Sequence, residues 1–304
     1  MGSNVVRWVP SAIKPPVQIP WETDPAAALV SVAGWLGDQV QGGPWRVAWC
    51  AGAGVVGTSA VELAEETRAL KVFLDALNTS CSAANGAIFL ASSAGGVHAG
   101  TLDDPVTERS SVAPISAYGR SKVEQERVVR TWSEETGAGA VIGRLSNLYG
   151  PGQNMAKPQG LISALVRASL RAEPMTVFVS LDTVRDYLFA ADAARRIGAA
   201  LDRVDAGASV GGDRTTVVKL IASGRATTIG QLIAEIHRIR KRRPPVVFGV
   251  SDGSRLQPRI LRFRSEVWPD LDRERSVTLA EGLAAVVRGQ EQALAAGARL
   301  DPSL

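Results

Sequence analysis

Only two cysteines and two histidines occur among the 304 residues, and aromatic residues make up 5% of the chain. Such scarcity disfavours a metal site built from histidine or cysteine, and leaves only His98 and His237 for a Ser-His-Asp triad. No stretch reaches the ~18 uninterrupted apolar residues of a membrane-spanning helix, and the first residues contain no secretory apolar core. We therefore expect a cytoplasmic protein with no bound metal and no membrane partner.

The charges nearly balance, with 34 basic against 30 acidic residues, and the one basic run is Arg238–Arg243. No aromatic side chains are interleaved with that run, so a solvated helix end is its simpler interpretation and no nucleic-acid partner is expected. Hydrophobic residues make up 45% of the sequence, enough for a sizeable core. The length predicts about two domains, which we place at 1–152 and 153–304.

Short apolar runs alternate with helical patterns through the first two-thirds of the chain. This alternation predicts a parallel α/β sheet covered by helices. The expected strands are Asn4–Val9, Arg46–Cys50, Ala87–Ala91 and Ala140–Gly143. The expected helices are Asp24–Val40, Ser59–Leu77, Ser121–Glu135, Gly160–Ala172, Asp192–Leu201, Thr228–Arg238 and Leu279–Ala296, and proline-rich Pro10–Pro20 is expected to be irregular.

Ligands of an open parallel sheet bind beyond the carboxyl ends of its strands, and polar residues stand at several of these ends. Ser92 and Ser93 follow one strand, and a helical segment opens with Tyr118 and Lys122, four residues apart and so on one helix face. An ammonium there would lower the pKa of the phenol, and the Ser93 hydroxyl could hydrogen-bond the same substrate oxygen. In isolation, the Tyr-Lys spacing is more typical of a surface helix than of a catalytic pair.

The order of these motifs is more specific than any one of them. Ser-Ser at a strand end precedes Tyr-x-x-x-Lys, then Arg144-Leu-Ser-Asn-Leu-Tyr-Gly-Pro151, then Arg185-Asp-Tyr187. From about Arg46 to about Gly289 the chain resembles the extended short-chain dehydrogenase/reductases, the NAD-dependent epimerase/dehydratases. The resemblance implies a Rossmann-like parallel sheet with helices on both faces and a smaller C-terminal α/β substrate domain, part of 184–222 returning to the sheet.

Residue roles follow from the resemblance. Ser93 would polarise the substrate, Tyr118 would be the acid/base, and Lys122 would support Tyr118 and bind nicotinamide ribose. Residues at the strand ends would flank the cofactor, NAD or NADP. Ser93 and two further side chains would contact the substrate, a nucleotide-sugar or similar polyol. The cofactor-binding set is Cys50, Ala51, Gly52, Ser92, Tyr118, Lys122 and Leu145, and the substrate set is Ser93, Asn147 and Arg185. His98 replaces a tyrosine of the family's pattern and is interpreted as a loop filler.

The chain departs from the family at its dinucleotide fingerprint. Gly52-x-Gly54-x-x-Gly57 has the right glycine spacing, but no acidic residue closes the next strand, and too few residues separate it from the serine strand. The preferred alignment makes Arg46–Gly52 the third strand and Asn4–Val9 the second, so that the first strand and its glycine loop are missing. Three explanations stay open: a start downstream of the natural one, a closed gap with weak or no cofactor binding, or a pyrophosphate role for the Gly52 loop.

The favoured function is an NAD(P)-dependent epimerase or ketoreductase, with Tyr, Lys and Ser assisting hydride transfer. A dehydratase is disfavoured because Ala94 and Gly95 stand where it would carry an acidic pair. The alternative is a non-catalytic binding or regulatory relative that has lost dinucleotide binding. The resemblance also implies a homodimer formed through the helices Ser59–Leu77 and Ser121–Glu135.

Overall fold

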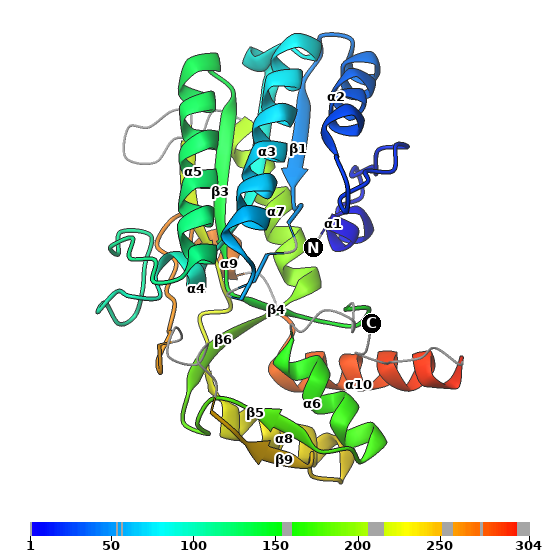
Figure 1. Ribbon diagram of the computed structural model, residues 1–304, viewed down its shortest axis with the longest axis vertical. Helices are drawn as coiled ribbons and strands as arrows, with labels where there is room; N and C mark the ends of the chain where they lie inside the picture. Colours follow the sequence, from blue (N-terminus) through cyan, green and yellow to red (C-terminus); the bar gives the residue numbers. More distant parts are fainter. Residues whose placement is uncertain are drawn as a thin grey trace.

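The computed structural model describes residues 2–52, 54–55, 57–153, 160–205, 216–250, 258–273 and 276–296. The chain forms two lobes, with a parallel sheet and its covering helices in one and a smaller group of helices and short strands in the other (Figure 1). No helix in these ranges is both long and apolar enough to span a membrane.

Within these ranges, the main sheet contains four parallel strands in the order β1-β2-β3-β7. Their bounds are Trp45–Trp49 (β1), Gly86–Ser93 (β2), Gly139–Leu145 (β3) and Thr216–Ile221 (β7). The central strands are almost continuously apolar because helices cover both faces of the sheet. In β2, Ile88 and Leu90 pack into the core on one face, and Ala87 and Phe89 into the core on the other. The expected α/β class and three of the four expected strands are confirmed.

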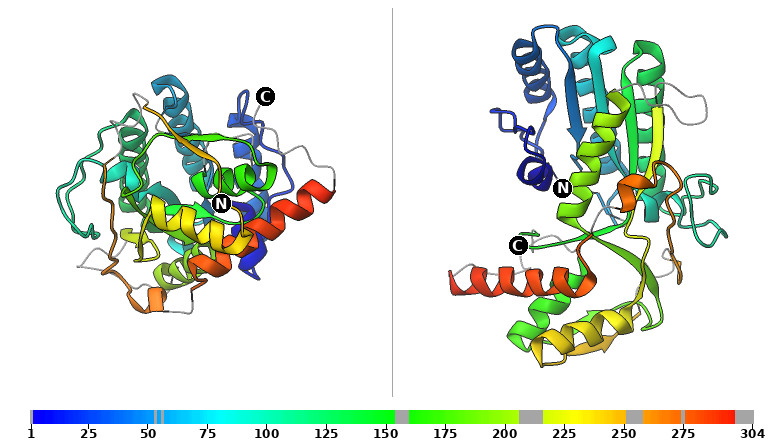
Figure 2. Two further views of the ribbon diagram at one scale, coloured as in Figure 1. Left: turned by 90° about the horizontal axis from the view of Figure 1, so that it is seen from below. Right: turned by 180° about the vertical axis from the view of Figure 1, so that it is seen from behind.

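Three long helices lie on one face of this sheet and two helices on the other (Figures 1 and 2). The first face is covered by α2 (Ala26–Val40), α3 (Ala60–Ser80) and α5 (Ala117–Thr136), and the second by α1 (Gly2–Trp8) and α7 (Ala190–Asp205). A capping box at Ser59 and Glu62 starts α3, and Ser116 caps α5 through the Gly119 N–H. Gly137, at φ 76°, ends α5 in the left-handed conformation.

The expected strand Asn4–Val9 is wrong, because these residues form helix α1 and its exit. Val5 and Val9, four residues apart, belong to the same core cluster as the apolar face of α7, and this helical spacing outweighs the short apolar run. Arg7 therefore lies on a helix rather than at a strand end. Its cation faces the Trp8 ring at 5.6 Å.

The irregular segment after α1 passes from one face of the sheet to the other. Val9 and Ala12 pack in the α7 core, whereas Val17 and Ile19 pack in the core beneath α2 and α3. Trp21 then meets Trp49, the last residue of β1, edge to face at 6.0 Å. This proline-rich crossing therefore contacts the cores on both faces of the sheet and the last residue of β1.

The order of strands also bears on which strand of a full dinucleotide-binding sheet β1 corresponds to. In the order 3-2-1-4-5-6, the third strand pairs only with the second. Here β1 pairs directly with the serine strand β2, in register from Trp45 opposite Gly86 to Trp49 opposite Leu90. The assignment of Arg46–Gly52 as the third strand therefore requires that the gap left by the first two strands has closed, and it stays a prediction. Within the described ranges, the order follows the chain in one direction, as strands 4-5-6 do.

The second lobe is built around a separate apolar core. Its helices are α6 (Leu161–Arg171), α8 (Ile229–Arg240) and α10 (Leu279–Ala295), each close to its expected position. Its strands are β4 (Asn147–Tyr149), β6 (Val184–Phe189) and β8 (Ala226–Thr228) in one sheet, and β5 (Met175–Val177) and β9 (Val246–Phe248) in another. The chain returns from β6 to the main sheet through α7 and β7.

Residues 258–273, which end in the short helix α9 (Asp270–Arg273), join the two lobes. Val184 N–H donates to Arg259 O, and Val106 N–H donates to Arg262 O. The Lys219 ammonium of β7, fully buried, donates to Ser265 Oγ at 2.9 Å, Val267 O at 2.8 Å and Asp272 Oδ2 at 2.7 Å. This segment thus connects strand β6, the loop before α5 and the edge of the main sheet.

Candidate functional site

Ser93 ends strand β2 and is also the N-cap of the one-turn helix α4 (Ala94–Val97). Its Oγ accepts the Gly96 N–H at 3.1 Å. Leu145 pairs with Ser93 in the neighbouring strand, so the ends of β2 and β3 lie side by side. The predicted catalytic serine and the predicted nicotinamide-flanking leucine are thus brought together at the carboxyl edge of the sheet.

Tyr118 lies in the first turn of α5, directly over this strand end. Glycine at position 119 permits the approach, since a Cβ there would lie 2.3 Å from Gly96 O. The Tyr118 ring packs against Gly96, and Ser93 hydrogen-bonds the phenol. Burial raises the pKa of Tyr118, the Ser93 hydrogen bond lowers it in part, and the Glu66 charge raises it further. The raised pKa differs from the lowered one expected from Lys122.

Lys122 lies one turn further along α5 and is buried. Its Nζ is 5.8 Å from the centre of the Tyr118 ring and donates to Gln125 Oε1 at 2.9 Å. Burial lowers the pKa of this ammonium, while Glu66 and Glu126 oppose the change. The ammonium is thus close to the phenol without contacting its oxygen.

The residues after β1 lie against an unexpected charge, the Glu66 carboxylate of α3. Cys50 is a thiol whose pKa burial raises to about 11, consistent with no redox role. Gly52, at φ 124°, lies beside the Glu66 carboxylate of α3, and the Gly54 N–H donates to Glu66 Oε1 at 2.8 Å. A carboxylate therefore receives an amide hydrogen that a dinucleotide fingerprint directs toward pyrophosphate.

Ser92 faces away from its neighbour Ser93 and is buried. Its Oγ donates to Glu126 Oε1 at 2.5 Å, and Glu126 also binds Arg144 of β3 at 2.7 Å between Oε2 and Nη2. The hydroxyl of Ser92 is therefore engaged in the protein interior and not directed toward a cofactor. If Ser92 contacts a cofactor, it does so through its backbone and not through its hydroxyl.

The predicted substrate residues lie in the second lobe, at the strands that follow the main sheet. Asn147 is exposed, and its Nδ2 donates to Asp186 O at 3.1 Å. Arg185 is buried, its Nη1 donates to Val184 O at 2.8 Å, and burial lowers its pKa. Both residues border the junction of the lobes, with Asn147 paired to Tyr187 across β4 and β6.

The sequence predictions assigned no role to Glu66, Glu126 or Arg144, and interpreted His98 as a loop filler. A carboxylate four residues after Lys122 was the available signal for Glu126, because it lies on the same face of α5. Glu66 gave no comparable signal, since its helix carries several exposed acidic residues. No cluster of three or more potential metal-ligating side chains occurs in the portion of the chain that the structure describes.

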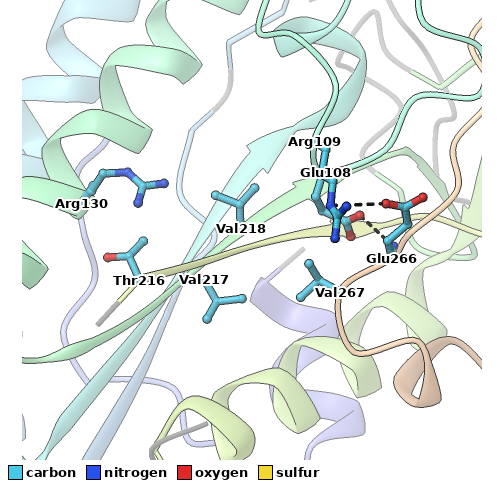
Figure 3. Close-up of a pocket in the computed structure, with 8 residues that line it drawn as sticks. All are labelled: Glu108, Arg109, Arg130, Thr216, Val217, Val218, Glu266 and Val267. Atoms are coloured by element: carbon cyan, nitrogen blue, oxygen red, sulfur yellow. Dashed lines mark hydrogen bonds and ion pairs between the residues drawn. The ribbon is translucent and has the colours of Figure 1, made fainter. Parts of the chain in front are cut away.

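One cavity of about 280 Å³ lies elsewhere, on the outer side of β7 (Figure 3). Its walls come from that strand, from α5, from the loop before α5 and from residues 266–267. Glu108 accepts the Leu220 N–H at 3.0 Å and the Glu266 N–H at 2.8 Å beside it. Because none of the predicted catalytic residues lines this cavity, it is separate from the candidate site.

Comparison with known proteins gives a family match over more than half of the chain. The sequence model of the "NAD dependent epimerase/dehydratase family" matches residues 42–214. A UDP-glucose epimerase of Bacillus subtilis, itself described as uncharacterized, is 28% identical over 139 residues, 43% of each chain. A dTDP-4-dehydro-6-deoxyglucose reductase of Escherichia coli is 33% identical over 105 residues, 34% of this chain and 33% of that one. The alignments thus span less than half of these relatives.

Solved structures share the fold at lower identity. The UDP-glucose 4-epimerase of Thermotoga maritima with UDP-glucose has a TM-score of 0.72 at 22% identity, covering 87% of this chain and 82% of that one. The RMD protein of Pseudomonas aeruginosa complexed with NADPH has a TM-score of 0.72 at 20% identity, covering 96% and 95%. These similarities confirm a Rossmann-type architecture.

Proposed function

The chain belongs to the NAD dependent epimerase/dehydratase family, and we propose that it is an NAD(P)-dependent epimerase or ketoreductase of a nucleotide-linked sugar. The observation that carries this proposal is the meeting of Ser93, Tyr118 and Lys122 at the carboxyl edge of β2. Similar proteins support the substrate class, since their names include a UDP-glucose epimerase and a dTDP-sugar reductase.

The described residues fit the nicotinamide-ribose end of a dinucleotide. Lys122 and Tyr118 would hold the ribose, and Leu145 would flank the ring, which supplies or accepts a hydride when the cofactor is bound. The Gly52–Gly54 backbone would approach the diphosphate, although the Glu66 carboxylate opposes an anion there. Positive charge for that end would have to come from other groups.

Proton transfer is assigned to Tyr118. In a reduction, its Oη–H would give its proton to the substrate carbonyl oxygen while the Ser93 hydroxyl donates a hydrogen bond to that oxygen. The nearby Lys122 ammonium would stabilise the phenolate that forms. In an epimerisation, the same phenolate would first remove the proton of the substrate hydroxyl.

Reduction or epimerisation is proposed in preference to elimination. A dehydratase needs an acid and a base in addition to Tyr118, and Ala94 and Gly95 after the serine supply neither. Asn147 and Arg185 are proposed to contact the substrate from β4 and β6. The structure leaves Asn147 accessible for this, whereas buried Arg185 would have to act through the strand that it supports.

The test begins with calorimetric titration of the protein with NAD⁺, NADH, NADP⁺ and NADPH. We expect saturable binding of one pair, followed by turnover of a UDP- or dTDP-linked sugar. The Tyr118→Phe variant should lose about 10²–10⁴-fold in kcat while still binding the cofactor. Full turnover by that variant would contradict the assignment of Tyr118 as the acid/base.

A non-catalytic binding relative is the second candidate, supported by the Glu66 carboxylate on the Gly54 amide. This candidate predicts no binding of any of the four nucleotides by the folded protein. The Glu66→Gln variant, which removes the opposing charge, separates the two candidates further. Binding gained only in that variant would favour the non-catalytic relative.

We also propose a cytoplasmic homodimer formed through α3 and α5. Both cysteines are free thiols, as expected in a reducing compartment. The outer surfaces of α3 and α5 carry Arg68 paired with Glu65 and Arg127 paired with Glu124, so the interface would be polar. Analytical ultracentrifugation tests the dimer, and Val61→Asp, on an exposed α3 position, should dissociate it.

A further inference from the structure

His98 is fully buried beneath the candidate site, and both of its ring nitrogens have partners. Nδ1 lies 2.9 Å from Ser111 O, and Nε2 lies 3.1 Å from Arg144 Nη1. A carbonyl oxygen can only accept a hydrogen bond and a guanidinium can only donate one. The ring must therefore be neutral, with its proton on Nδ1 and its Nε2 lone pair toward Arg144.

Arg144 continues this chain of hydrogen bonds into the site. Its Nε donates to Glu126 Oε1 at 3.1 Å and its Nη2 donates to Glu126 Oε2 at 2.7 Å. Glu126 also accepts the hydroxyl of Ser92, the residue before Ser93. Every side chain in the series is buried, so each partner has few alternatives within the protein.

The arrangement decides which cation neutralises Glu126. Lys122 and Glu126 are four residues apart on α5, a spacing that ordinarily favours an ion pair. Instead, Lys122 Nζ donates to Gln125 Oε1, and the Glu126 carboxylate binds Arg144 with both oxygens. The lysine ammonium consequently stays beside the Tyr118 ring, at 5.8 Å from its centre.

We propose that His98 is a positioning residue that holds Arg144 on Glu126 and thereby keeps Lys122 available to Tyr118. The role of Lys122 in turnover rests on the proposed function, whereas the hydrogen-bonded series does not. Without the imidazole, Arg144 loses the acceptor on one side of its guanidinium and can rotate away from Glu126. The buried carboxylate of Glu126, no longer neutralised by Arg144, would then attract the Lys122 ammonium toward itself.

The loop before α5 is part of this arrangement, because Ser111 supplies the acceptor for His98 Nδ1. The groups that face or electrostatically influence the imidazole are Arg144 from β3, Glu126 from α5 and Asp103 from the loop. Thr101 offers a matched control in the same loop. Its Oγ1 bonds to Ser111 Oγ at 3.0 Å, with no connection to Arg144.

The first experiment determines the tautomer of His98 by ¹⁵N NMR of the histidine rings. His237, the other histidine, is exposed and can be removed as His237→Gln to assign the signals. We expect a neutral ring with the proton on Nδ1 at pH 7. A proton on Nε2, or a charged ring at pH 7, would overturn the proposal, and this measurement needs no variant at position 98.

The second experiment measures the pKa of Lys122 by NMR of ¹³Cε-labelled lysine, assigned with Lys122→Arg. His98→Phe should raise this pKa by about one unit, because Glu126 then attracts the ammonium. His98→Gln keeps one donor and one acceptor and should restore much of the original value, and Thr101→Val should leave it unchanged. Equal shifts in His98→Phe and Thr101→Val, or no shift in either, would refute the positioning role.

Turnover supplies a third readout that separates this proposal from the proposed function. His98→Phe should lower kcat about tenfold to a hundredfold with little change in KM, because the catalytic group is displaced and substrate contacts remain. A change in KM with an unchanged kcat would contradict the proposal. A wild-type protein with no turnover would refute the proposed function, while the two NMR measurements would still decide the role of His98.

Discussion

Replacing Lys219 by methionine should be among the most destabilising single changes on the surface of contact between the two lobes. The ammonium has three N–H donors, and the structure gives it three acceptors, from Ser265, Val267 and Asp272. Methionine fills a similar volume but leaves these oxygens without their donor. Segment 258–273 would lose its connection to β7.

The expected cost follows from burial. Removing one partner of a buried ion pair costs about 3–5 kcal/mol. Asp272 is 21% exposed on its side chain and keeps its contact with Arg196 at 3.2 Å, so a value near the lower end, about 3 kcal/mol, is expected. Lys71, exposed and 3.9 Å from Glu124, is the matched control, and Lys71→Met should cost less than about 0.5 kcal/mol.

Urea unfolding followed by tryptophan fluorescence measures both variants. A cost for Lys219→Met below about 1 kcal/mol, the range of exposed ion pairs, would refute the reasoning. Proteolysis of the native variant gives an independent readout, since the loosened segment 258–273 should be cleaved faster than in Lys71→Met. Equal cleavage in both variants would show that the segment does not depend on the buried ammonium.

Three further changes test other parts of the molecule. Gly143→Ala would place a Cβ 2.1 Å from Phe89 Cζ and should cost about 1–3 kcal/mol, whereas Gly34→Ala in α2, with no atom within 4 Å, should stabilise by about 0.5–1 kcal/mol. Calorimetric unfolding compares the two, and equal effects would contradict the packing argument. Burial and Arg144 lower the pKa of His98, so stability should fall as pH drops below about 6.5, and His98→Gln should flatten that part of the curve. If the stability of His98→Gln depends on pH as steeply as that of the wild type, His98 is not the cause of the pH dependence. Trp21→Ala removes the contact with Trp49 and should speed proteolysis within residues 10–25, and an unchanged rate would refute an anchoring role.

The alternation of apolar runs and amphipathic helices was enough to predict the sheet and most helices. Those runs are buried on both faces, so each leaves a continuous apolar pattern. Asn4–Val9 has a similar run but satisfies helical spacing through Val5 and Val9, and only packing against α7 distinguishes the two. Strand order likewise depends on pairing, which no local pattern specifies.

Some residues of the candidate site could be predicted from the sequence and others could not, for a related reason. Ser93, Tyr118 and Lys122 fall in ordered motifs, and their proximity agrees with the expectation. His98, Arg144 and Glu126 come from three separate elements, and their meaning depends on hydrogen bonds between them. Spacing along the chain carries no information on such contacts, so these hydrogen bonds could not be predicted.

The one-directional strand order has a consequence for how the protein assembles as it is synthesised. Strand β2 pairs with β1 and β3 pairs with β2, each with the strand made just before it, so three of the four described strands can pair in the order of synthesis. Only β7 must wait, because β4, α6, β5, β6 and α7 lie between it and β3. Until then, the outer side of β3 stays open to pairing with another chain. Arrival of β7 closes that edge and buries Lys219, whose three acceptors at residues 265–272 are synthesised only later.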